Sequence, residues 1–164
     1  MFKQILISIL AFLLTIFPNS STLLGNYQEL TFPGMHEISQ QIVDAINNND
    51  VEAFKEVLSP NMKKNVPDLD AKIQFLMNSI DDNIINYRVS DSGGGSTSNY
   101  GYFVESKIWT VDFKNNDLLY SIVLRYRVAD TESPDNVGLI VVRLMCADSV
   151  DPDYATNDII TFKY

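Results

Sequence analysis

Few residues of this 164-residue chain have side chains suited to nucleophilic or metal chemistry. His36 is the only histidine and Cys146 the only cysteine. A Ser-His-Asp or Cys-His arrangement would have to use His36, and a metal site built from several His and Cys ligands is excluded. His36 precedes the first predicted helix, so we expect it at the surface. Cys146 lies in the apolar run GLIVVRLMCA, which predicts a buried, inert thiol.

The carboxylates give no clear catalytic pattern either. Asp112 is the only aspartate inside a predicted strand, and because it lies beside a turn we expect a solvated side chain rather than a general base. Four acids of the tail carry oxygen ligands of the kind that calcium prefers, but their spacing matches no EF-hand loop, and a solvated acidic tail is favoured. They are Asp148, Asp151, Asp153 and Asp158. We predict no catalytic residue, no metal site and no cofactor.

The glycine-rich segment Gly93–Ser98, GGGSTS, lacks the Gly-Lys-Ser/Thr and the helix that would follow in a phosphate-binding loop. A flexible connector is the favoured interpretation. A loop whose backbone amides cradle an anion is the alternative.

Hydroxyl-bearing side chains recur on the strand faces that we assign to the interior. Such side chains can rim a small-molecule pocket, since an amphipathic ring orients a ligand while burying apolar area. The alternative is an ordinary core beneath the helices. The candidate pocket residues are Tyr102, Ser106, Thr110, Tyr120 and Tyr126.

The opposite faces of the same strands are predicted to form a cationic patch with one tryptophan. Arginine and tryptophan are enriched where partners dock, so self-association into a homodimer is the leading use of this patch. A solvated face with cross-strand charge pairs is the alternative. The patch residues are Lys107, Trp109, Arg125, Arg127 and Arg143, accompanied by Glu105.

The elements that carry these side chains are predicted to form an α+β fold. Apolar residues at helical spacing predict helices from Met35 to Ile46, over 49–58 and over 68–79, the last with Asp68 as its cap. Alternating segments predict strands at 85–90, 100–113, 118–128 and 137–146, with a short edge strand in the tail. We therefore expect three N-terminal helices packed on the concave face of a curved antiparallel sheet of four or more strands.

The first 25 residues have the pattern of a secretory signal. Lys3 precedes the apolar block Ile5–Phe17, and Pro18 ends it. Residues 26–34 then form a linker and residues 35–164 a single domain. We expect a secreted or extracytoplasmic protein; an uncleaved membrane anchor is the alternative. The net charge of −9 argues against nucleic acid and anionic lipid as partners, and we expect no membrane contact beyond the signal segment.

Three helices followed by an antiparallel meander resemble the nuclear-transport-factor-2-like superfamily, also described as cystatin-like. The details resemble a secreted bacterial family within it, domain of unknown function 5104. The matching segments are Lys64–Asp70, Gly93–Ser98, Tyr120–Ile122 and Ser133–Gly138. The resemblance implies a cone of helices in a curved sheet with a concave pocket, and no assigned activity. Many members look like lipoproteins, whereas this chain has no signal-peptide cysteine.

Taken together, these patterns predict a secreted, non-catalytic binding module for a small molecule or a protein partner. Two alternatives remain open. One is a small-molecule isomerase or hydrolase, because enzymes of the resembled superfamily usually place an Asp or a Tyr–Asp pair on the concave face. The other is a structural domain that mediates interactions at the cell surface.

Overall fold

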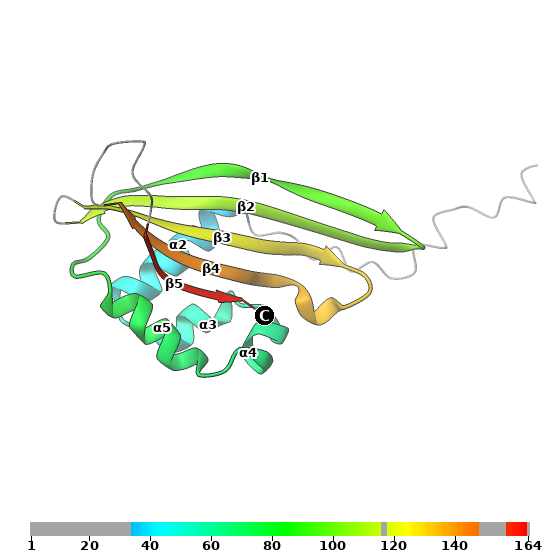
Figure 1. Cartoon of the computed structure of the whole chain (residues 1–164), viewed down its shortest axis with the longest axis horizontal. Coiled ribbons are helices and arrows are strands. Elements are labelled where there is room, and N and C mark those ends of the chain that lie inside the picture. Colours follow the sequence, from blue (N-terminus) through cyan, green and yellow to red (C-terminus); the bar gives the residue numbers. More distant parts are fainter. Residues whose placement is uncertain (1–33, 116–117, 148–156, 164) are drawn as a thin grey trace, which may run out of the picture. The chain divides into compact units, whose positions relative to one another are not determined.

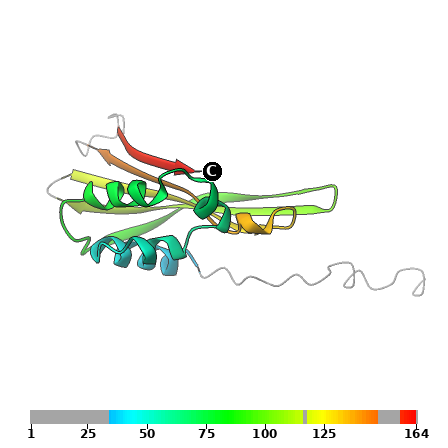
Figure 2. The same cartoon turned by 90° about the horizontal axis from the view of Figure 1, so that it is seen from below.

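The computed structural model describes residues 34–115, 118–147 and 157–163. The predicted signal segment, nearly all of the predicted linker, and Asp148, Asp151 and Asp153 lie outside the described residues. Four described α-helices precede five strands, which makes the fold α+β (Figure 1). The helices gather on one side of the sheet, and the view from below shows them in front of it (Figure 2).

The sheet is an antiparallel meander in the order β1-β2-β3-β4-β5. Each strand pairs with its sequence neighbour, so β1 and β5 are the edges. The tail therefore supplies an edge strand, as predicted. The bounds are β1 Tyr87–Asn99, β2 Tyr102–Asn115, β3 Leu118–Asp130, β4 Gly138–Ala147 and β5 Asn157–Lys163, with the short 3-10 helix η2 at Pro134–Asn136.

The helical layer has one helix more than the sequence predicts. Its members are α2 Met35–Asn47, α3 Val51–Glu56, α4 Pro60–Asn65 and α5 Leu69–Asn78. The unpredicted helix, α4, begins at Ser59-Pro60: the Ser59 hydroxyl accepts a hydrogen bond from the Met62 amide at 3.1 Å, and Pro60 occupies the first turn. The other helices match their predicted positions. Asp68 precedes α5 in the left-handed conformation and makes no side-chain cap bond, so its predicted capping bond is wrong.

The glycine-rich segment is a strand and not a connector. Gly93–Ser98 lies within β1 and pairs with β2 from Ile108 to Phe103. The register shifts between Asp91 and Gly93, where Gly93 has φ +114° and its amide donates to the Asp91 carboxylate at 2.7 Å. A Cβ on Gly94 would collide with the Ser106 carbonyl oxygen. Glycine thus permits a bulge and a close backbone approach, which outweigh its low strand propensity.

The core lies between the helices and one face of the sheet. Trp109, Val111 and Phe113 of β2 are all buried, and β3 places Leu124, Ile122 and Tyr120 opposite them. We call this the inner face. The predicted faces are correct for β3 but wrong for β2, where Trp109 is fully buried and not on the outer surface. Apolar residues occur on both faces of β2, so alternation alone did not identify the inner one.

Trp109 can be fully buried because its polar ring nitrogen has a hydrogen-bond partner. Its indole N–H donates to the Ser39 hydroxyl of α2 at 2.9 Å, and that hydroxyl donates to the Met35 carbonyl at 2.7 Å. Because the N–H is satisfied, the large ring adds apolar burial without the cost of an unpaired donor.

Backbone hydrogen bonds join the helical layer to β4. The Ser59 amide donates to the Leu139 carbonyl and the Leu139 amide donates to the Val57 carbonyl, both at 3.0 Å. Gly138 lies directly against this junction with φ +123°, and a Cβ there would lie 2.7 Å from the Cα of Ser59. Glycine is needed at this position on both counts.

Polar side chains extend the same junction. The buried carboxylate of Asp130 accepts hydrogen bonds from the Ser133 amide and from the Asn136 side chain, each at 2.8 Å. Asn61 of α4 donates to Asn136 at 2.6 Å, and Asn65 donates to Asn61 at 2.6 Å. The β3–β4 connection is thus held against α4.

We expect truncation of the buried face of α5 to be costly. Leu76 and Ile73 are both 0% exposed, so Leu76→Ala or Ile73→Ala should lower the free energy of unfolding by about 2–5 kcal/mol. Phe75 of the same helix is 52% exposed, and Phe75→Ala is the matched control, with a much smaller loss. Urea denaturation of the three variants measures the difference. Equal midpoints for Leu76→Ala and the parent protein would contradict this placement of α5.

Gly138→Ala should lower the free energy of unfolding by at least about 2 kcal/mol, because it combines an unfavourable φ with a collision against backbone atoms. Gly95→Ala is the control: a Cβ added there would meet no atom within 4 Å, and the φ of Gly95 is not positive. Thermal and denaturant unfolding should separate the two variants. If the Gly138→Ala protein were as stable as the Gly95→Ala protein, the backbone at the junction would accommodate a Cβ, and this prediction would be wrong.

Candidate functional site

The five hydroxyl-bearing residues predicted to rim a pocket are distributed over both faces of the sheet. Tyr120 and Tyr126 belong to the inner face, where Tyr120 stacks on Phe113 with ring centroids 5.4 Å apart. Thr110 lies on the outer face, Ser106 is buried, and Tyr102 is 48% exposed at the start of β2. The structure therefore does not bring these residues together around one cavity, and the predicted inward orientation of the β2 members is wrong.

Asp112 is a hydrogen-bonded carboxylate and not a solvated turn residue. It lies on the outer face, where it accepts from Ser121 at 2.6 Å, from Thr110 at 3.2 Å and from Ser90 at 3.4 Å. Arg88 approaches it at 3.7 Å, and the Asp112 side chain is 19% exposed. The donors come from β1, β2 and β3, so Asp112 joins three strands on the outer face.

No tyrosine is placed to work with Asp112 as a Tyr–Asp pair within the described part of the chain. Tyr120 lies on the opposite face of the sheet, next in sequence to the Ser121 that bonds Asp112. Burial, together with nearby Cys146 and Asp81, raises the pKa of Tyr120, and burial raises the pKa of Tyr126. Both phenols therefore stay protonated near neutral pH, which does not favour proton abstraction by either one.

The predicted cationic patch is retained only in part. Arg125 and Arg143 lie on the outer face, because their pairing partners Ile108 and Val123 share a side with Thr110. Lys107 and Glu105 have the parity of Trp109, on the other side, and pair with each other at 3.7 Å. Arg127 forms an ion pair with Asp130 at 3.1 Å. The patch as predicted, with an exposed tryptophan, is therefore wrong.

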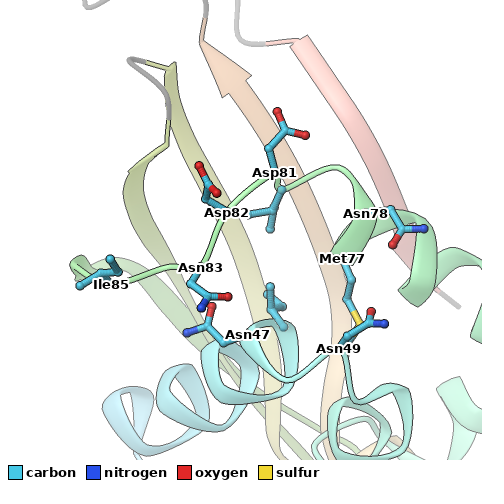
Figure 3. Close-up of a pocket in the computed structure, with 10 residues that line it drawn as sticks. Asn47, Asn49, Met77, Asn78, Asp81, Asp82, Asn83 and Ile85 are labelled. Atoms are coloured by element: carbon cyan, nitrogen blue, oxygen red, sulfur yellow. The ribbon is translucent and has the colours of Figure 1, made fainter.

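One hollow among the described residues has a volume of about 850 Å³ and opens to solvent. It lies where α2 and α5 end and where the chain leads from α5 into β1 (Figure 3). Its polar lining consists of carboxamides and carboxylates, and its apolar lining of aliphatic side chains and a methionine. The lining residues are Ile46, Asn47, Asn49, Met77, Asn78, Ile80, Asp81, Asp82, Asn83 and Ile85.

Hydrogen bonds fix the walls of this hollow. The side chain of Asn47 donates to the Ile84 carbonyl at 3.0 Å and accepts from the Ile84 amide at 2.8 Å, which joins the end of α2 to the segment before β1. Gln74 donates to Asn49 at 2.7 Å and to Asn78 at 3.1 Å. The Gln74–Asn78 bond lies within α5. The bonds of Asn47 to Ile84 and of Gln74 to Asn49 cross between elements, so tertiary structure sets the geometry of the walls.

The electrostatics of the hollow favour positive charge. The carboxylates of Asp81 and Asp82 are exposed at its rim, and the ten described lining residues include no basic side chain. The last turns of α2 and α5 also contain no basic residue, so the partial negative charge of two helix C-termini is not offset there. An ammonium group would be attracted and an anion repelled.

Sequence reasoning missed this hollow. Apart from Asn78, its polar residues come from two short polar runs, Asn47-Asn48-Asn49-Asp50 at the end of α2 and Asp81-Asp82-Asn83 after α5. Such runs ordinarily indicate the end of a helix and carry no further signal when taken singly. The signal available was their similar composition after two helices, whose ends both line the hollow.

Two further findings bear on function. Among the described residues, no helix has the length and apolarity needed to cross a membrane. The side chains described also form no group of three or more His, Cys, Asp or Glu residues suited to holding a metal ion.

Comparison with known proteins identifies the family but no activity. A search of curated proteins found no match to the sequence. The family model described as Domain of unknown function (DUF5104) matches residues 41–147, which include the helices from α3 onward, four of the five strands and all ten lining residues of the hollow. Since the match extends over more than half of the 164 residues, the chain belongs to the DUF5104 family.

Proposed function

We propose that this domain is a secreted, non-catalytic binding domain that takes a small organic cation in the hollow between the ends of α2 and α5. The observation that carries the proposal is the lining of that hollow, in which two exposed aspartates and two helix C-termini meet without a basic side chain among the described lining residues. Export is supported by the pattern of residues 1–25.

The size and lining of the hollow suit a small amine. Pockets for small ligands commonly have volumes of about 300–1,000 Å³, and the value here falls within that range. Asp81 and Asp82 provide acceptors for an ammonium group, and the exposed side chain of Ile85 provides apolar surface for its methylene groups. Because the hollow is open and its carboxylates are exposed, binding should be weak and sensitive to salt.

The absence of an activated side chain around the hollow favours binding over catalysis. The ten described lining residues contain no His, Cys, Lys, Ser or Tyr, so a nucleophile or a general base would have to be an exposed aspartate. An inward carboxylate within reach of a tyrosine would favour the alternative of an isomerase or hydrolase. Asp112 and Tyr120 lie on opposite faces of the sheet instead.

The finer fold assignment belongs to the same proposal. We infer that the domain is nuclear-transport-factor-2-like, with helices seated against a curved sheet. The order of helices before a five-strand antiparallel meander, and the burial of one sheet face against those helices, support this assignment.

Calorimetric titration with putrescine and spermidine tests the cation site. We expect both amines to bind, with 1,4-butanediol, a neutral analogue of putrescine, binding at least about tenfold more weakly. Asp81→Asn with Asp82→Asn should weaken amine binding at least about tenfold, because the carboxylates supply most of the attraction. The matched control is Glu132→Gln with Asp135→Asn, which removes two exposed acids of the β3–β4 connection. Equal weakening by both double variants would refute a local site.

Asp112→Ala should lower the free energy of unfolding by about 1–3 kcal/mol, since three hydroxyls lose their acceptor. The same substitution, and His36→Ala, should leave the affinity for spermidine unchanged, because neither residue lines the hollow. Thermal unfolding and calorimetry on the same samples measure both effects. If a folded Asp112→Ala protein lost amine binding, the amine would bind at the outer face and the hollow would not be the site.

A further inference from the structure

The outer face of the sheet carries a concentration of positive charge. Six basic residues share it by strand register: Arg88, Lys114, Arg125, Arg127, Arg143 and Lys163. Four of them are exposed and two, Arg127 and Arg143, are half-buried. Arg88 approaches Asp112 at 3.7 Å and Arg127 pairs with Asp130 at 3.1 Å. The other exposed cations of this face, Lys114, Arg125 and Lys163, form no ion pair with another described residue. The described helices lie on the opposite face, so they do not cover these side chains (Figures 1 and 2).

Apolar side chains lie between these cations. The register places Ile108, Arg125, Val141 and Lys163 in one row across β2 to β5. In the neighbouring row, Val123 lies between Thr110 and Arg143. Ile108, Val123 and Val141 are half-buried, and neighbouring strands are about 4.8 Å apart, so a partner lying on this face would meet charge and apolar surface together.

The charge of this face contrasts with that of the whole chain. The chain has a net charge of −9, and the helical side carries many of the acids, including Glu37, Asp44, Glu52 and Glu56. At physiological salt, charges separated by more than about 8 Å are largely screened from one another, so a partner at the outer face responds to the local cations rather than to the net charge.

We propose that the outer face is a docking surface for an acidic protein segment in which carboxylates alternate with apolar side chains. We choose this occupant because its carboxylates are complementary to the basic side chains of the outer face. Face-to-face pairing of two copies would bring the same cations together, and the burial of Trp109 removes the aromatic group that would have favoured such a dimer. The surface is distinct from the hollow and has the opposite electrostatic preference.

A labelled 12-residue peptide of alternating glutamate and leucine is the probe, and the same peptide with lysine in place of glutamate is its counterpart. Fluorescence anisotropy should detect binding of the glutamate peptide and at least about tenfold weaker binding of the lysine peptide. Arg125→Glu with Lys163→Glu should weaken binding of the glutamate peptide at least about tenfold, because both side chains are exposed and flank Val141. Raising the salt concentration should also weaken it.

The control is Lys63→Glu with Lys64→Glu, which reverses two exposed charges on α4 and should leave the affinity unchanged. Thermal unfolding of both double variants verifies that they fold. Absence of binding to the glutamate peptide, or equal loss in both variants, would overturn the proposal. Sedimentation could also overturn the proposal. If the parent protein formed a dimer and the Arg125→Glu with Lys163→Glu variant did not, the occupant of this face would be a second copy of the chain.

Discussion

The rest of the described structure depends on the backbone junction between the helical layer and β4. Across it the Ser59 amide donates to the Leu139 carbonyl and the Leu139 amide donates to the Val57 carbonyl, and Gly138 lets the two backbones approach closely. Ser59 also begins α4, so a single residue both starts a helix and contacts the sheet. Because the amides involved are buried, losing the junction would leave unpaired groups as well as removing contacts. The helices are thereby held against one face of the sheet.

That attachment determines which face of every strand becomes the core. Once α2 lies against β2, the Trp109 ring is enclosed and its N–H reaches Ser39, while the next residue, Thr110, turns outward to Asp112. The same register carries Arg125, Arg143 and Lys163 to the open side. Core and exposed surface are therefore two consequences of one register, since a strand that shifted by one residue would exchange them.

The two proposed binding surfaces have opposite electrostatic character for separate structural reasons. The hollow is negative because α2 and α5 end beside each other and are followed by acids and amides. The outer face is positive because the register of an antiparallel meander gathers basic residues from strands far apart in sequence. Both arise from elements that the family model covers at least in part, with β5 as the exception.

The sequence by itself determined the fold class, the positions of three helices, four of the strands, and the faces of β3, because apolar periodicity there is unambiguous and local. It did not reveal α4, since Ser59-Pro60 is equally a helix start and a chain break. It also misplaced Gly93–Ser98 and the face of Trp109. Those outcomes were decided by tertiary structure: β2 pairs with the glycine segment, α2 selects one of two apolar faces, and two helix ends that are distant in sequence meet to form the hollow.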